Sequence, residues 1–151
     1  MQPISGTPTE TIQAEMDAVL QQCLRVAADY LSRFDTFIPF AILYREDTNL
    51  ERIEVMREDG STEVESQEAY DALVPGFVDR AAELHAVGVV SDVTLSQDDE
   101  AQGSAVRVEL EHRDEASRVL VAWARYTRDD AGAVTFAEEL GTSDGERRIW
   151  A

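Results

Sequence analysis

The chain has 151 residues, enough for one domain, and carries 31 acidic residues against 13 basic ones, so that its net charge is −18. All 13 basic residues are arginines; this excess of acid disfavours binding to nucleic acids and to anionic membranes, because both are polyanions. The absence of lysine also excludes a P-loop lysine, a Schiff-base lysine and a serine–lysine dyad.

The composition indicates a single folded domain spanning residues 1–151. A hydrophobic fraction of 44% argues against disorder, and no repeat or linker divides the chain. Cys23 is the only cysteine, which excludes an internal disulfide, and its apolar neighbours predict a buried thiol. Residues 1–6 lack the basic and apolar parts of a signal peptide, and the longest apolar stretch, 37–44, is far shorter than the about 18 residues of a membrane span. We therefore expect a cytoplasmic protein.

The first predicted element is a long amphipathic helix that begins at the capping box formed by residues 7–10. Its polar face is acidic, whereas a membrane-surface helix carries basic residues, so the apolar stripe is expected to pack on the core. The stripe follows three- and four-residue steps and consists of Ile12, Met16, Val19, Leu20, Cys23, Ala27, Tyr30, Leu31 and Phe34.

A hairpin is predicted next. Residues 37–44 are apolar at both alternating sets of positions, which is typical of a strand covered on two faces, and Pro39 is expected near its start. The polar residues 46–49 turn the chain into a second strand at 50–56, and residues 58–61 turn it out again.

A second amphipathic helix is predicted from Tyr70 to Leu84, and Pro75 with Gly76 should kink it or split it in two. His85 follows this pattern directly. We therefore interpret it as a side chain that complements the dipole at the C-terminal end of the helix.

From Val87 onward the apolar residues alternate, which predicts a run of antiparallel strands separated by an acidic loop at 97–104 and a turn at 129–132. Residues 118–127 are apolar on both faces and should form a central strand. The predicted fold is α+β: a central antiparallel sheet of five or six strands flanked by the N-terminal long helix and the second, Pro-interrupted helix.

The densest group of polar residues lies in the predicted strand that precedes the one at 118–127. Alternation places Arg107, Glu109, Glu111 and Arg113 on one face and His112 on the other, beside Val108 and Leu110. Metal ligands must converge on one point, so we expect no metal site at Glu111 and His112. The expected roles are cross-strand ion pairs on a solvated face and a histidine at the edge of the core.

If residues 113–118 form a hairpin loop, Glu109 lies opposite Ala122 and Arg107 opposite Ala124, so that charged side chains frame a strip of small residues. Such a strip can receive a helix, either one of the domain's own helices, which we favour, or a partner's. The candidate interaction surface consists of Arg107, Glu109, Glu111, Leu120, Ala122, Ala124 and Tyr126.

No common catalytic motif is present. The chain lacks G-x-S-x-G, H-E-x-x-H, C-x-x-C and a glycine-rich phosphate loop, so no catalytic residue, cofactor or metal is predicted. The acidic run 97–100 lacks the ligand spacing of an EF-hand and is interpreted as a solvated loop.

The order of one helix, two strands, a helix and a meander resembles the profilin-like and roadblock-like folds, which implies a central antiparallel sheet flanked by helices and no particular site. Three features also resemble a family of small uncharacterised bacterial proteins: Pro39-Phe40-Ala41 after a long helix, residues 108–113 in a strand, and Arg148-Ile149-Trp150 near the end. Some bacterial immunity proteins are similarly small, acidic and α+β.

Together these observations predict a non-enzymatic protein-interaction domain, either a homodimer or an acidic inhibitor of a basic partner, because surface acidity steers association with cationic surfaces. The alternative hypothesis is a small-molecule or metal-dependent enzyme that uses Glu109, Glu111 or His112. An enzyme needs a concave pocket with converging polar groups, whereas an interaction domain needs an exposed apolar patch.

Overall fold

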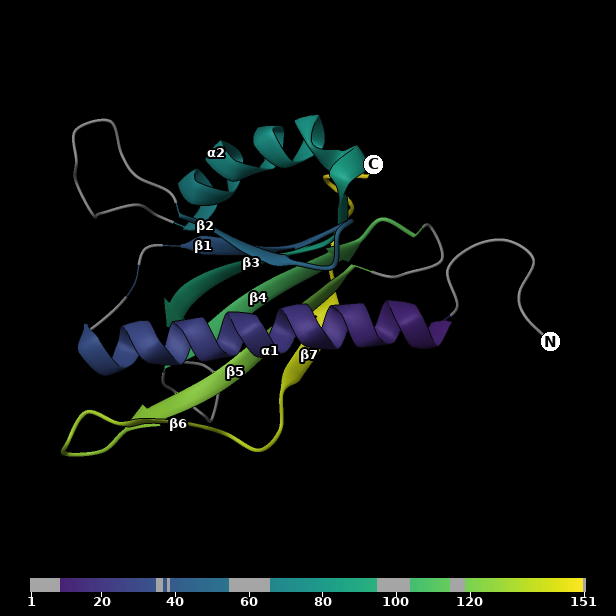
Figure 1. Ribbon diagram of the computed structural model, residues 1–151. Coiled ribbons are helices and arrows are strands. Elements are labelled where there is room, and N and C mark those ends of the chain that lie inside the picture. Colours follow the sequence, from purple (N-terminus) through teal and green to yellow (C-terminus); the bar gives the residue numbers. More distant parts are fainter. Residues whose placement is uncertain are drawn as a thin grey trace.

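The computed structural model describes residues 9–34, 37, 39–54, 66–94, 104–114 and 119–150. They form a curled antiparallel sheet of seven strands, with α1 on one face and α2 on the other (Figure 1). The elements are α1 (Thr9–Arg33), β1 (Phe40–Arg45), β2 (Leu50–Glu54), α2 (Ser66–Asp79), a 3-10 turn (Ala81–Glu83), β3 (Leu84–Thr94), β4 (Ser104–His112), β5 (Leu120–Arg128), β6 (Val134–Phe136) and β7 (Gly141–Asp144).

The strand order is β2-β1-β3-β4-β5-β6, and β7 pairs with β5 beside β6. The predicted α+β class is confirmed. The two strands with apolar residues on both faces lie inside the sheet, as expected: β1 lies between β2 and β3, and β5 lies between β4 and the pair β6 and β7.

Each face of the sheet carries its own hydrophobic core, because alternate residues of a strand point to opposite faces. Under α1 the strands contribute Phe40, Ile42, Val90 and Val108 among others. Under α2 they contribute Ala41, Leu43, Leu84, Val87 and Val89. The amphipathic stripe of α1 packs on the first of these cores, which confirms its predicted role, except that Phe34 lies beyond the helix end and is 59% exposed.

The second helix differs from its prediction at its C-terminal end. Of the two predicted effects of Pro75, the helix is not split in two, and Leu73 and Phe77 anchor its buried face on the sheet. The helix ends at Asp79, and Leu84 begins β3. A buried leucine fits the pattern of a helix and of a strand equally well, so periodicity misplaced this boundary.

Two further elements were not predicted. β7 is exposed along its whole length and has no apolar alternation to reveal it. The chain then crosses the sheet face on the α2 side as the segment 145–150, which ends beside α2 (Figure 1). The predicted capping box at 7–10 lies largely outside the described residues, and the turn at 58–61 and the acidic run at 97–100 lie entirely outside them. No helix among the described residues is long and apolar enough to cross a membrane.

The helix α1 approaches the sheet closely at Gly88 of β3. A Cβ atom there would lie 2.8 Å from both Cys23 Sγ and Val19 Cγ1, and 3.1 Å from Leu110 Cδ2. We expect Gly88→Ala to destabilise the fold by about 1–3 kcal/mol in urea unfolding, because overpacking forces the helix and sheet apart.

Gly76 of α2 is a matched control, since a Cβ atom there would meet nothing within 4 Å. Gly76→Ala should leave stability unchanged or raise it by up to about 1 kcal/mol, because alanine is the better helix former. Equal losses in the two variants would contradict the tight contact between α1 and β3.

Candidate functional site

The seven residues of the candidate interaction surface do not share one face of the sheet. β4 and β5 pair with Glu109 opposite Val121, Arg107 opposite Trp123 and Val108 opposite Ala122. The predicted register is therefore wrong by one residue, and a slip of one residue moves every side chain of a strand to the other face.

As a consequence, Leu120, Ala122, Ala124 and Tyr126 lie on the α1 side of the sheet. Ala122 and Ala124 are each 1% exposed, and Leu120, Ala124 and Tyr126 belong to or pack against the core under α1. Leu120, Ala124 and Tyr126 therefore lie where the domain's own helix α1 packs on the sheet. This agrees with the expectation that the strip receives one of the domain's own helices. Tyr126 donates a hydrogen bond to Asp92 (2.7 Å), and burial, with this bond, raises the pKa of Tyr126 to about 12.

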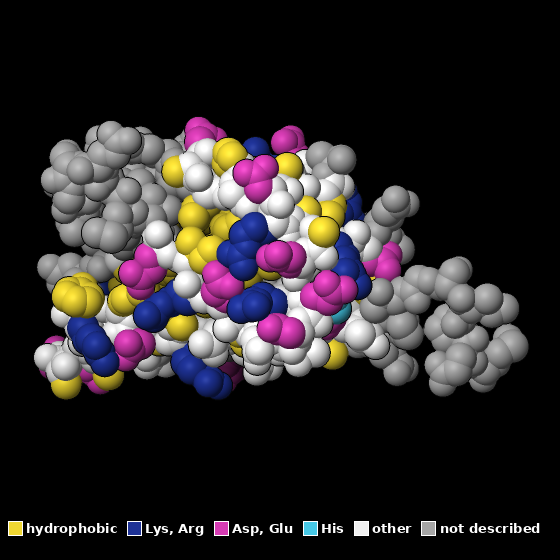
Figure 2. All heavy atoms as spheres, turned by 45° about the horizontal axis from the view of Figure 1, so that its top comes forward, with side chains coloured by type: hydrophobic (Ala, Val, Ile, Leu, Met, Phe, Trp, Pro, Cys, Tyr) yellow, Lys and Arg dark blue, Asp and Glu magenta, His cyan; other side chains and the backbone are white. Residues whose placement is uncertain are grey.

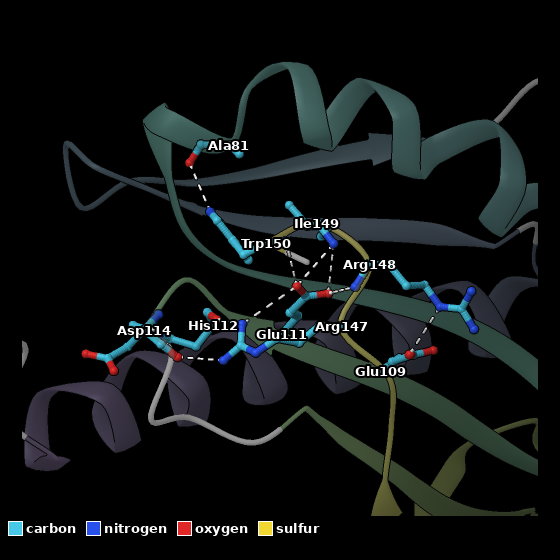
Figure 3. A network of polar contacts seen from close by, with 9 residues as sticks. All are labelled: Ala81, Glu109, Glu111, His112, Asp114, Arg147, Arg148, Ile149 and Trp150. Carbon is cyan, nitrogen blue, oxygen red and sulfur yellow. Dashed lines mark hydrogen bonds and ion pairs between the residues drawn. The ribbon is translucent and has the colours of Figure 1, made fainter.

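Arg107, Glu109 and Glu111 face the α2 side, and His112 faces α1, so the predicted separation of Glu111 from His112 is confirmed. The predicted solvated face is wrong. Glu109 and Glu111 are each 3% exposed, because the segment 145–150 lies over them (Figure 3).

Glu111 holds that segment by its backbone. Its carboxylate accepts hydrogen bonds from the N–H groups of three consecutive residues: Arg148 (3.0 Å), Ile149 (3.2 and 3.1 Å to the two oxygens) and Trp150 (2.9 Å). These bonds fix the main chain of the segment against β4. Its acceptor positions are used by the chain itself, so Glu111 has a structural role in this conformation.

Glu109 is enclosed by two arginines. Arg107 lies 3.4 Å and Arg148 3.7 Å from its carboxylate oxygens. Arg147 completes the attachment by donating to the carbonyl oxygens of His112 (3.0 Å) and Asp114 (2.6 Å), and the Trp150 indole N–H donates to the carbonyl of Ala81 (3.3 Å; Figure 3).

A second polar cluster, which the sequence did not predict, lies on the opposite face. Glu15 of α1 bridges two histidines: His85 Nδ1 lies 2.6 Å from Glu15 Oε2, and His112 Nε2 lies 2.8 Å from Glu15 Oε1. We call Glu15, His85 and His112 the Glu15 cluster. Its one sequence signal is the position of Glu15, three residues after Ile12 and four before Val19, on the apolar stripe.

The hydrogen bonds determine which nitrogen of His112 carries the proton. The Asp114 backbone N–H donates to Nδ1 (3.0 Å), so Nδ1 is unprotonated and Nε2–H donates to Glu15. For Glu15, burial favours the neutral acid, but hydrogen bonds from His85 and His112 and the electrostatic attraction of these side chains outweigh it and lower the pKa of Glu15 below 4.5. The cluster thus holds an ionised carboxylate at 7% exposure.

The interpretation of His85 as a helix cap is wrong, because His85 lies in β3. The β1–β3 register shifts here: Tyr44 pairs with Ala86 and Arg45 with Leu84. The shift re-aims the His85 side chain toward Glu15, where it stacks on Tyr44. His85 Nε2 is buried without a hydrogen-bond partner among the described residues.

No group of three or more His, Cys, Asp or Glu side chains in the described ranges is placed to hold a metal ion. Cys23 is buried, as predicted, and burial raises the pKa of its thiol. Glu109, Glu111 and His112, the residues of the enzymatic hypothesis, do not converge on one point.

Comparison of the chain with protein-family models, with curated proteins and with solved structures finds no match.

Proposed function

We propose that this protein is a non-enzymatic, cytoplasmic interaction domain that binds a basic protein partner. The observation that carries the proposal is that its acidic residues fall into a buried set and an exposed set. Glu15, Glu109 and Glu111 are buried and bonded to the chain's own donors, whereas a second set of acids is displayed on one edge of the sheet.

That edge is residues 129–146, which we call the acidic edge. It contains no Arg, Lys or His, and it lies at the β6 and β7 side of the sheet. All six of its acids are exposed: Asp129, Asp130, Glu138, Glu139, Asp144 and Glu146. Leu140, at 39% exposure, adds an apolar contact point. A stretch of chain that carries acidic residues alone favours association with a partner of the opposite charge.

The α2 side of the molecule differs from the acidic edge. Figure 2 shows arginine side chains interleaved with acidic ones there, around uncovered hydrophobic side chains. Arg80, for example, forms an ion pair with Glu51 on this side (2.9 Å). Mixed charge of this kind attracts a basic surface less than a stretch of unmixed acid does.

The experiment compares two double variants with equal charge change. Partners cross-linked to the chain in a lysate are identified, purified and measured by surface plasmon resonance. Glu138→Gln with Glu139→Gln should reduce the association rate constant by about three- to tenfold at low salt. Asp17→Asn with Asp29→Asn, both exposed on α1, should change it by less than about twofold, since these acids lie outside the acidic edge.

Equal reductions in the two variants would mean general attraction without a site and would contradict the proposal. Sedimentation of the chain alone separates the two forms of the hypothesis. A stable homodimer that binds no basic partner would favour self-association instead.

The salt dependence of stability provides an independent prediction. With a net charge of −18, self-repulsion should exceed the gain from exposed ion pairs, which contribute about 0–1 kcal/mol each. The melting temperature at neutral pH should therefore rise from very low salt to about 0.1 M NaCl, where the Debye length is about 10 Å. A melting temperature that falls over this interval would show that the acids are mostly engaged in favourable pairs.

A further inference from the structure

The segment 145–150 is held as a bound peptide would be. Its contacts come from five of its six residues: Gly145 N–H donates to the Val119 carbonyl (2.8 Å), Arg147 to two carbonyls, and Arg148, Ile149 and Trp150 to Glu111. Ile149 is 7% exposed and belongs to the core under α2. The body of the domain supplies acceptors and apolar contacts, and the segment supplies donors and the buried aliphatic side chain of Ile149.

The chemistry of the site is therefore specific. Two buried carboxylates, Glu109 and Glu111, face backbone N–H groups and guanidinium groups. Release of the segment would uncover Glu109 and Glu111 and remove the donors that it supplies to their carboxylates. Another segment that carries the same donors can bond the same acceptors.

The attachment is also open to exchange at its surface. The Arg148 side chain is 38% exposed and Trp150 is only partly buried. Val78 of α2, on the same side of the molecule, is 46% exposed, and Figure 2 shows hydrophobic side chains uncovered on this face. A competing segment can reach the rim of the site before the resident one has left.

We propose that this face, bounded by Glu109, Glu111 and the Ala81 carbonyl, is a docking site for a short partner segment of two basic residues followed by an aliphatic and an aromatic residue. Residues 147–150 occupy the site in the free protein, and the partner's segment displaces them. The inference rests on the proposed function, since such a segment belongs to a basic partner.

The experiment uses the full chain and a fluorescein-labelled peptide that copies residues 145–151, Gly-Glu-Arg-Arg-Ile-Trp-Ala. Fluorescence anisotropy should show saturable binding. Trp150→Ala in the protein weakens only the resident segment, so it should raise the affinity for the peptide at least about tenfold, because the competition is reduced. A scrambled peptide of identical composition and charge should bind at least tenfold more weakly than the copy.

Glu111→Gln should abolish binding of the peptide, and this variant is informative if it folds. The Trp150→Ala variant and the scrambled peptide keep the proposal falsifiable if it does not. Equal affinity for the copied and the scrambled peptide, or an unchanged affinity in Trp150→Ala, would overturn the inference. A concentration-dependent dimer dissolved by the peptide would also overturn it, in favour of a second copy as the occupant.

The measurements distinguish failure of the docking site from failure of the proposed function. Glu138 and Glu139 lie outside the docking site, so Glu138→Gln with Glu139→Gln should leave affinity for the peptide unchanged. A basic partner that binds through the acidic edge while the peptide fails to bind would remove only the docking site.

Discussion

Replacing Glu111 by glutamine should destabilise the protein by about 3–5 kcal/mol, the cost typical of breaking a buried charged interaction by removing one partner. The Glu111 carboxylate accepts hydrogen bonds from Arg148, Ile149 and Trp150. Glutamine keeps one acceptor oxygen and turns an NH₂ group toward backbone donors, so at least one N–H becomes unpaired at a buried position. Urea unfolding followed by circular dichroism measures the change.

The loss of stability in Glu111→Gln should also be seen within the segment 145–150. Once the segment is released, the amide protons of residues 148–150 should exchange with solvent much faster, because their acceptor is weakened. Glu146→Gln is the matched control, as Glu146 lies in the same segment and is exposed; it should change stability by no more than about 0.5 kcal/mol. If the two variants were equally stable, the role assigned to the Glu111 carboxylate would be wrong.

Glu15→Gln should destabilise the protein by about 2–3 kcal/mol at pH 7, since hydrogen bonds to a charged group contribute about 1.5–3 kcal/mol each and glutamine retains only part of them. The carboxylate of Glu15 joins α1 to β3 through His85 and to β4 through His112. Asp17→Asn, at an exposed position of the same helix, should cost less than about 0.5 kcal/mol.

The effect of Glu15→Gln should depend on pH in a defined direction. Because the folded state lowers the pKa of Glu15 below 4.5, its ionisation contributes stability that is fully present above pH 4.5 and is lost as the pH falls through the folded value. The stability difference between wild type and Glu15→Gln should therefore shrink below about pH 4.5. A difference that stayed constant from pH 7 to pH 3 would contradict an ionised Glu15 in the cluster.

Local patterns in the sequence determined the types of most elements, though not of β7, and the interior positions of β1 and β5. A strand that is apolar on both faces needs cover on both, and this requirement holds in any arrangement of neighbouring strands. The same reasoning separated Glu111 from His112, because alternation within one strand depends only on the local backbone.

Tertiary structure alone decided which residues meet. The register of β4 and β5 differs by one residue from the expected hairpin, and this difference moved Ala122 and Ala124 to the α1 side. No local pattern distinguishes the two registers, since residues of β5 are apolar on both faces.

The two polar clusters were hidden from the sequence for related reasons. Glu15 and His112 are 97 residues apart, and His85 joins them only because the β1–β3 register shifts beside it. Glu111 appeared solvated because the segment that covers it lacks any strand or helix period. Composition and alternation thus determined the class of fold and the acidity of the surface, whereas long-range packing decided that the most suggestive carboxylates lie inside, where each binds donors from a distant part of the chain.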